Sequence, residues 1–145
     1  MVQPILHLSI PVRNLPEAHS FYVGTLGCQA ARAREGFQDV FFFGMQITLH
    51  DRPDEVVALA EGGVRHFGVT LAREDFDDVV KRLNAADVTW LVPVTTDDAG
   101  TDLEQTKTKI ADPSGNVIEF KTYADVATAL EMSPHSYPTA AEHGN

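Results

Sequence analysis

Two histidines and one glutamate have the types and spacing of a metal site. His7 lies in "ILHLSIPV", His66 in "VRHFGVTL" and Glu119 in "PSGNVIEFK", and all three runs are typical of short β-strands. A carboxylate on a buried sheet face is unfavourable unless it is paired, ligated or hydrogen-bonded. Two imidazoles and one carboxylate that face one point offset this cost by holding a divalent cation. With open coordination positions this ligand set suits Fe(II), with Mn, Co, Ni or Zn as competitors.

A metal-free interpretation of the same residues is also open. Each histidine can hydrogen-bond a neighbouring strand, and Glu119 can pair with Lys121 or with an arginine. The equivalent places of the three candidates in an internal repeat favour the metal site over this alternative.

The repeat relates the two halves of the chain. "ILHLSIPV" aligns with "VRHFGVTL", which sets His7 over His66, and "FGMQITLH" aligns with "PSGNVIEFK", which sets Thr48 over Glu119. Each half predicts a strand, a helix and three further strands. One such module leaves the inner face of its curled sheet open, so two modules must pair. We therefore predict an α+β fold of two paired βαβββ modules that form a curled mixed sheet around a central cleft.

The modules are expected at about 4–52 and 64–123, joined by a turn-rich linker at 53–63 and forming a single domain over 1–123. Residues 124–145 are expected to add a short helix and a mobile tail. The predicted elements of the first module are a strand at 4–12, a helix at about 14–26 and strands near 28–34, 38–43 and 45–51. Those of the second module are a strand at 64–72, a helix at about 74–86 and strands near 88–95, 105–111 and 116–123. Asn14 is the expected N-cap of the first helix, and Gly27 its stop signal.

Side chains alternate between the two faces of a strand, so each repeated strand splits into an apolar and a polar row. The polar rows contain His7 and Ser9; Gln46, Thr48 and His50; His66, Gly68 and Thr70; and Glu119 and Lys121. His50 lies one step beyond Thr48 on the same face. We predict that His50 is a general acid or base or a substrate contact rather than a metal ligand.

Composition narrows the classes of partner. The 145 residues carry a formal net charge of −10, which argues against nucleic acid as the main partner because phosphate binding needs clustered Lys and Arg. Neither a long apolar run nor a basic leader is present, so we expect no membrane partner and a cytoplasmic location. The single cysteine, Cys28, is expected to be a packing residue.

These motifs together resemble the vicinal oxygen chelate superfamily, also called glyoxalase/bleomycin resistance/dioxygenase. The resemblance spans roughly 4–123 and rests on "HLSIPV", "FYVGTLGC", "HFGVTL" and "DPSGNVIEFK". Within the superfamily it is closest to small proteins described as predicted extradiol-dioxygenase relatives. It implies paired βαβββ modules, a divalent metal in the cleft at the positions of His7, His66 and Glu119, and a homodimer.

Two departures from the superfamily pattern bear on the chemistry. Family members can take a fourth ligand where the repeat puts Thr48, and threonine is a poor ligand for such ions. Ring-cleaving dioxygenases carry a His and a Tyr shortly before the "DPSG" turn, whereas "TDLEQTKTKIADPSG" has neither and Lys109 takes the Tyr position. These departures disfavour catechol cleavage. Lys107, Lys109 and Lys121 are either contacts for an anionic substrate or solvated surface lysines.

The function expected from the sequence is that of a divalent-metal-dependent enzyme that binds a small substrate through vicinal oxygens. Its reaction is dioxygenase-like or isomerase/lyase-like, with Glu119 or His50 moving a proton. The alternative is a metal-free protein that sequesters a small aromatic or antibiotic-like molecule, with Phe37, Phe41, Phe43 and Trp90 as walls. A purely structural dimer is the weakest hypothesis, because it leaves Glu119 without a role.

Overall fold

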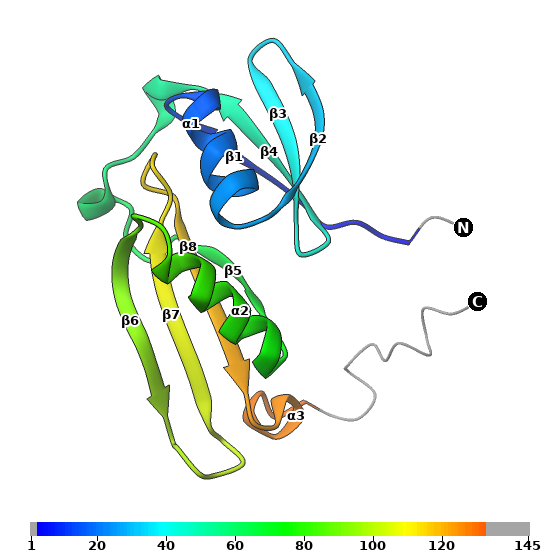
Figure 1. Cartoon of the computed structure of the whole chain (residues 1–145), viewed down its shortest axis with the longest axis vertical. Coiled ribbons are helices and arrows are strands. Elements are labelled where there is room, and N and C mark those ends of the chain that lie inside the picture. Colours follow the sequence, from blue (N-terminus) through cyan, green and yellow to red (C-terminus); the bar gives the residue numbers. More distant parts are fainter. Residues whose placement is uncertain (1–2, 133–145) are drawn as a thin grey trace.

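The two halves of the chain fold into two four-stranded sheets with the same arrangement of strands. The computed structural model describes residues 3–132 and orders the sheets β1-β4-β3-β2 and β5-β8-β7-β6. In each sheet the first strand pairs in parallel with the last, and the remaining pairs are antiparallel. The predicted α+β fold of two βαβββ modules is confirmed (Figure 1).

The bounds of the elements follow the repeat. The first module contains β1 (His7–Val12), α1 (Leu15–His19), the π-helical segment η1 (Ser20–Thr25), β2 (Gln29–Arg34), β3 (Phe37–Phe42) and β4 (Met45–Asp51). The second contains β5 (Phe67–Thr70), α2 (Arg73–Asn84), β6 (Thr89–Asp97), β7 (Gln105–Ala111) and β8 (Val117–Tyr123). Two short 3-10 turns, η2 (Pro53–Glu55) and η3 (Leu59–Glu61), form the linker, and the helix α3 (Val126–Ala129) follows β8.

The first helix begins as predicted but does not continue as one α-helix to residue 26. Asn14 is the N-cap, and its Oδ1 accepts a hydrogen bond of 2.8 Å from the backbone N–H of Glu17. After His19 the chain widens into the π-helical segment η1, which buries the adjacent rings of Phe21 and Tyr22. Gly27 (φ 74°) then ends the helical stretch, since a left-handed conformation suits glycine.

The strand predicted at 64–72 is shorter than expected, and His66 lies just before it. β5 starts only at Phe67, because the preceding residues turn so that the His66 ring contacts the carbonyl of Val64. The strand predicted at 4–12 likewise starts at His7, while β6 runs on to Asp97, beyond the predicted limit of 95.

The two modules share one hydrophobic core. The Phe42 ring of β3 packs edge-on against Phe67 of β5, with ring centroids 5.6 Å apart, and lies 6.0 Å from Phe120 of β8. α2 adds Phe76 and Leu83 to the same cluster. The modules are therefore fixed relative to each other by aromatic packing.

The "DPSG" turn forms a polar joint between the modules. Asp112 is buried and accepts hydrogen bonds from the Tyr22 hydroxyl (2.8 Å) and from the backbone N–H groups of Ser114 (2.9 Å) and Asn116 (2.8 Å). Ser114 and Asn116 in turn reach the first module, where Asn116 donates to the carbonyl of Pro11 at 2.9 Å. The motif thus has a structural role, which agrees with its interpretation as a turn signal.

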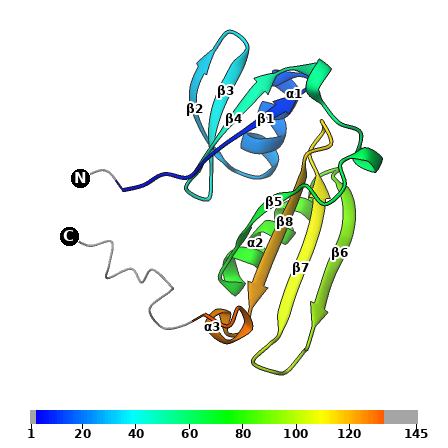
Figure 2. The same ribbon diagram turned by 180° about the vertical axis from the view of Figure 1, so that it is seen from behind.

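Both helices cover the same side of the molecule. In Figure 1, α1 and α2 lie in front of their sheets, and in Figure 2, seen from behind, the sheets lie in front of the helices. The apolar rows of the strands face α1 and α2, so the polar rows occupy the opposite side. This leaves two polar sheet faces, one per module, side by side on the face seen in Figure 2.

The end of the chain adds one short helix to this frame. α3 confirms the expected helix after β8, although it is only one turn long. The prediction of a mobile tail falls mainly on 133–145, outside the described residues. Within 3–132, no helix combines the length and apolar character needed to cross a bilayer.

Candidate metal and substrate site

Glu119 and His66 form the centre of the polar face of the second module. Glu119 projects from β8 and is buried (7% exposed), and its Oε2 lies 3.2 Å from Nε2 of His66. Gly68 of β5 pairs with Glu119, and a side chain at position 68 would collide with the backbone carbonyl of Glu119. Glycine is therefore required for β5 to approach β8 closely enough to bring the two groups together.

The hydrogen bond of the second ring nitrogen fixes the tautomer of His66. Nδ1 lies 2.6 Å from the carbonyl oxygen of Val64, and a carbonyl oxygen only accepts, so Nδ1 carries a hydrogen and donates it. In the neutral ring, Nε2 then presents a lone pair toward the Glu119 carboxylate. Histidine ligands of metals are usually oriented in this way, by donating the other ring N–H to a backbone carbonyl or a carboxylate.

Two lysines flank the same carboxylate. Nζ of Lys121 lies 3.4 Å from Oε2 of Glu119, and Nζ of Lys109 lies 4.0 Å from Oε1. His66, Glu119 and Lys121 line one open cavity of about 330 Å³, together with Tyr123 and Leu130. The ion pair between Glu119 and Lys121, which the metal-free interpretation predicts, is thus present.

His7 and His50 lie on the polar face of the first module. They line a second cavity of about 410 Å³ with Ser9, Arg32, Phe37, Gln46 and Thr48. The exposed His7 ring places Nε2 3.3 Å from the Ser9 hydroxyl, and the His50 ring lies 6.1 Å from the Phe37 ring. His50 therefore shares a face with His7, as the alternation predicts.

Asp39, which is not among the predicted site residues, organises this first face. It is 3% exposed and accepts hydrogen bonds from the Thr48 hydroxyl (2.6 Å), the Gln46 amide (3.2 Å) and the Arg32 guanidinium (3.1 Å). Desolvation acts to raise the pKa of Asp39, but the bonds from Thr48, Gln46 and Arg32 outweigh it and hold the pKa below its ordinary value. Thr48 is thus committed to Asp39, which explains why a threonine stands there. In the sequence, this role could have been inferred from an aspartate inside the apolar run "FQDVFF", because a buried carboxylate needs partners.

One chain does not bring the three predicted ligands together. His66 and Glu119 are in contact, whereas His7 lies in the other cavity. Over 3–132, no group of three His, Cys, Asp or Glu side chains could hold a metal ion. The repeat gives His7 and His66 equivalent places, but within one chain the two histidines line different cavities.

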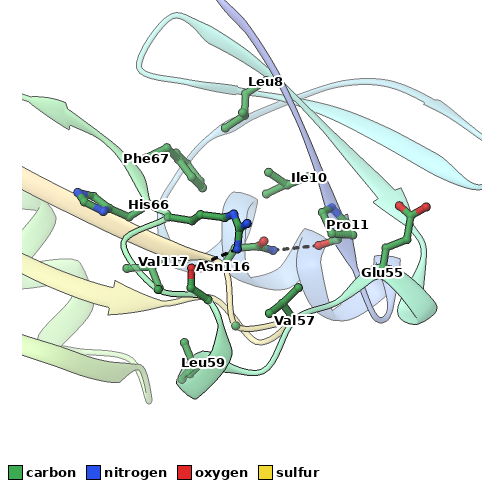
Figure 3. A pocket seen from close by; sticks show the side chains of 14 residues that line it. Leu8, Ile10, Pro11, Glu55, Val57, Leu59, His66, Phe67, Asn116 and Val117 are labelled. Atoms are coloured by element: carbon green, nitrogen blue, oxygen red, sulfur yellow. Dashed lines mark hydrogen bonds between the residues drawn. The ribbon is translucent and has the colours of Figure 1, made fainter.

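An apolar cavity of about 320 Å³ lies between the modules, lined by residues of both and of the linker (Figure 3). Leu8 and Ile10 of β1 line one side, and Phe67 lines the other, next to His66. Val57, Leu59 and Glu55 of the linker complete the wall. Asn116 lies at the centre of the view, and its amide bonds the carbonyl of Pro11.

The four aromatic residues predicted to wall one cleft do not share a cavity. Phe37 lines the His7 cavity, whereas Phe41 and Phe43 line a separate cavity with Cys28. Trp90 lies on β6 and is 36% exposed. The prediction fails because Phe41 and Phe43 flank the turn into β4, and the cavity that they line with Cys28 is separate from the cavity of His7.

Cys28 is the packing residue that the sequence predicts. Its side chain is buried in the core, and burial raises the pKa of the thiol to about 11. The thiol is therefore protonated at neutral pH, which fits a packing role.

Known proteins share this fold and parts of this sequence. A family model described as the glyoxalase/bleomycin resistance protein/dioxygenase superfamily matches residues 4–120. A glyoxalase/bleomycin resistance protein/dioxygenase from Alicyclobacillus acidocaldarius is 35% identical, with a TM-score of 0.72 over 84% of this chain and 92% of that chain. The fosfomycin resistance protein FosX from Listeria monocytogenes, complexed with Mn(II) and sulfate, is 17% identical, with a TM-score of 0.65 over 90% of this chain and 98% of that chain. This second likeness shows the fold alone.

No curated protein matches the chain significantly. The family match nevertheless covers the "DPSG" joint and the segments of both modules that carry His7, His66 and Glu119. The chain therefore belongs to the glyoxalase/bleomycin resistance protein/dioxygenase superfamily.

Proposed function

We propose that the chain is a divalent-metal-dependent enzyme that binds a small substrate through vicinal oxygens. Its metal site is shared between the two copies of a homodimer, with His66 and Glu119 from one copy and His7 from the other. The observation that carries the proposal is the geometry of His66, whose Nε2 faces Oε2 of the buried Glu119 at 3.2 Å while its Nδ1 donates to Val64.

This geometry is favourable when a proton or a metal ion lies between the two groups. A neutral ring with its hydrogen on Nδ1 and an ionised carboxylate point lone pairs at each other, which is repulsive unless a proton or a metal ion lies between them. Neighbouring ligands at right angles around an ion, each about 2.1 Å from it, are about 3 Å apart, close to the separation of the two groups. A nitrogen and a carboxylate oxygen suit Fe(II), which we expect to be favoured over Mn, Co, Ni and Zn.

The exposed His7 supports a site between copies. The polar faces of both modules are open on one side of the molecule, so a two-fold axis can lay the His7 face of each copy over the Glu119 face of the other. The Mn(II) complex of FosX indicates that the fold can carry a divalent ion.

The residues of the two faces divide the chemistry. A bound ion supplies Lewis-acid polarisation of the substrate oxygens. His50, on the same face as His7, is placed to accept or donate a proton at the substrate, and Glu119 is a second candidate for proton transfer. Both dioxygenase-like and isomerase/lyase-like reactions are compatible with these roles.

Metal binding tests the proposal directly. We expect metal-free protein to bind Mn(II), measured by electron paramagnetic resonance, and Glu119→Gln to lose nearly all binding because it loses the negative charge. His7→Ala and His66→Ala should weaken binding. His19→Ala is the matched control, since His19 bonds Gln38 on the first module and should leave binding unchanged. Full Mn(II) binding by Glu119→Gln would contradict the proposal.

Mixing two variants tests whether the site is shared between chains. His7→Ala and Glu119→Gln chains are co-expressed with different tags. In a mixed dimer, one site combines the intact His7 of one chain with the intact His66 and Glu119 of the other. We expect roughly a quarter of all sites to recover in a random mixture of the two chains. No recovery would show that the ligands come from one chain.

The metal-free sequestration protein is retained as a second candidate because of the apolar cavity between the modules (Figure 3). Such a protein would bind an apolar dye in that cavity equally well with and without a chelator, and Val57→Asp would reduce the binding. In a metal-dependent enzyme, a chelator would abolish catalysis and metal-dependent ligand binding.

A further inference from the structure

Three of the four lysines of this acidic chain gather around Glu119. Lys107 and Lys109 lie on β7 and Lys121 on β8, all on the polar face, and the fourth, Lys81, lies on α2. Lys107 pairs directly with Lys121 across the sheet, and Lys109 pairs with Glu119. In a chain of net charge −10, this concentration of positive charge on one face calls for an explanation.

The lysines are not balanced by the carboxylates beside them. Lys107 has its own partner, because its Nζ lies 2.7 Å from Oδ2 of Asp97. Lys109 and Lys121 share the single carboxylate of Glu119, at 4.0 and 3.4 Å. Like charges opposite each other in a sheet are destabilising, and Lys107 lies opposite Lys121, although Asp97 neutralises Lys107. The face therefore carries an excess of positive charge even before a metal ion binds.

A cation at Glu119 increases this excess. The carboxylate that neutralises Lys109 and Lys121 would then be shared with a divalent ion, and two ammonium groups would stand beside that ion. These side chains are 31% and 32% exposed, so solvent screens them only in part. An anion that bridges the lysines and the ion restores the balance.

We propose that Lys109 and Lys121 form a subsite for an anionic group of the substrate, a carboxylate or a phosphonate, next to the metal. The inference rests on the proposed metal site and specifies its substrate class as a small anionic molecule. Metal and anion then bind with positive coupling, because each offsets the charge of the other. Lys107, paired with Asp97, lies at the edge of this subsite.

The first arm of the test uses Mn(II) with methylphosphonate or acetate as the probe anion. We expect the better of the two anions to raise the Mn(II) affinity of the full chain about tenfold. Comparison of the two anions shows whether the subsite prefers a phosphonate or a carboxylate. The double variant Lys109→Met/Lys121→Met should bind Mn(II) more tightly without the anion and show no anion effect. Lys81→Met makes the same kind of charge change on α2 and should behave as wild type.

The second arm needs no metal. Glu119→Gln removes the carboxylate that occupies Lys109 and Lys121, so metal-free Glu119→Gln should bind the same anion, seen as a rise in melting temperature. Adding Lys109→Met/Lys121→Met should remove that rise. If the full chain does not bind Mn(II) but metal-free Glu119→Gln binds the anion, the metal site is refuted and the anion subsite stands. An anion effect that persists without both lysines, or no anion effect in either arm, would overturn the subsite.

Discussion

Asp39 is a negative charge held almost out of solvent on the face of the first module, and its ionisation links stability to pH. Its folded pKa lies below the ordinary value of 3.8, so the ionised form stabilises the fold above about pH 4, and this contribution is lost as pH falls through the folded pKa. Asp39→Asn should therefore cost about 1–2 kcal/mol at pH 7 and clearly less at pH 3.

Urea denaturation at both pH values measures this difference. Asp98→Asn is the control, because Asp98 lies in the exposed hairpin with φ 51°, a conformation that asparagine also adopts. An equal cost of Asp39→Asn at pH 7 and pH 3 would show that the carboxylate charge does not matter.

Single residues were predictable where alternation alone decides their face. His66 and Glu119 were each placed on the polar row of their own predicted strand from the period of two, and they are in contact. Asp39 was not recognised, because its partners Arg32 and Thr48 are on the two neighbouring strands, and strand pairing is not visible in a local pattern.

The pairing of β5 with β8 depends on one glycine. An alanine at position 68 would place its methyl group against the backbone carbonyl of Glu119, so β5 or β8 must shift. We expect Gly68→Ala to destabilise the fold by about 1–3 kcal/mol and to weaken Mn(II) binding as His66 and Glu119 move apart.

Gly24→Ala provides the matched control. Gly24 lies in η1 with open space around it, so alanine there should be neutral or stabilising by up to about 1 kcal/mol. Thermal unfolding and Mn(II) titration of both variants distinguish the outcomes. If Gly68→Ala were as stable as wild type and bound Mn(II) equally well, β5 and β8 would have space for a methyl group at position 68.

The order and type of the elements were predictable, but their local character was not. The helix expected over 14–26 has the predicted cap at Asn14 and stop at Gly27, yet it becomes π-helical after His19. Apolar spacing does not distinguish the two helix types over such a short stretch, because both bring Phe21 and Tyr22 to the core.

The arrangement of the modules was the part of the candidate site that the repeat did not reveal. Alignment of the halves shows that His7 and His66 are equivalent. This equivalence is the same whether the two polar faces meet or lie side by side, so it does not predict how the modules are arranged. Tertiary packing decides between these arrangements: Phe42 packs on Phe67 and Phe120, and the "DPSG" turn bonds the first module. Within one chain His7 and Glu119 line different cavities, so the proposed shared site needs a second copy of the chain.

The dimer is the prediction on which the assembled site depends. Each copy leaves two polar faces open, and a metal ion that needs ligands from both copies binds the dimer but not the monomer. Light scattering should give about twice the chain mass of 15.9 kDa, and Mn(II) should shift dimer formation to lower protein concentration. In His7→Ala that shift should disappear, because the ion then contacts only His66 and Glu119 of one copy. A monomer at micromolar concentration in the presence of saturating Mn(II) would rule out the shared site and would return His7 to a role outside metal binding.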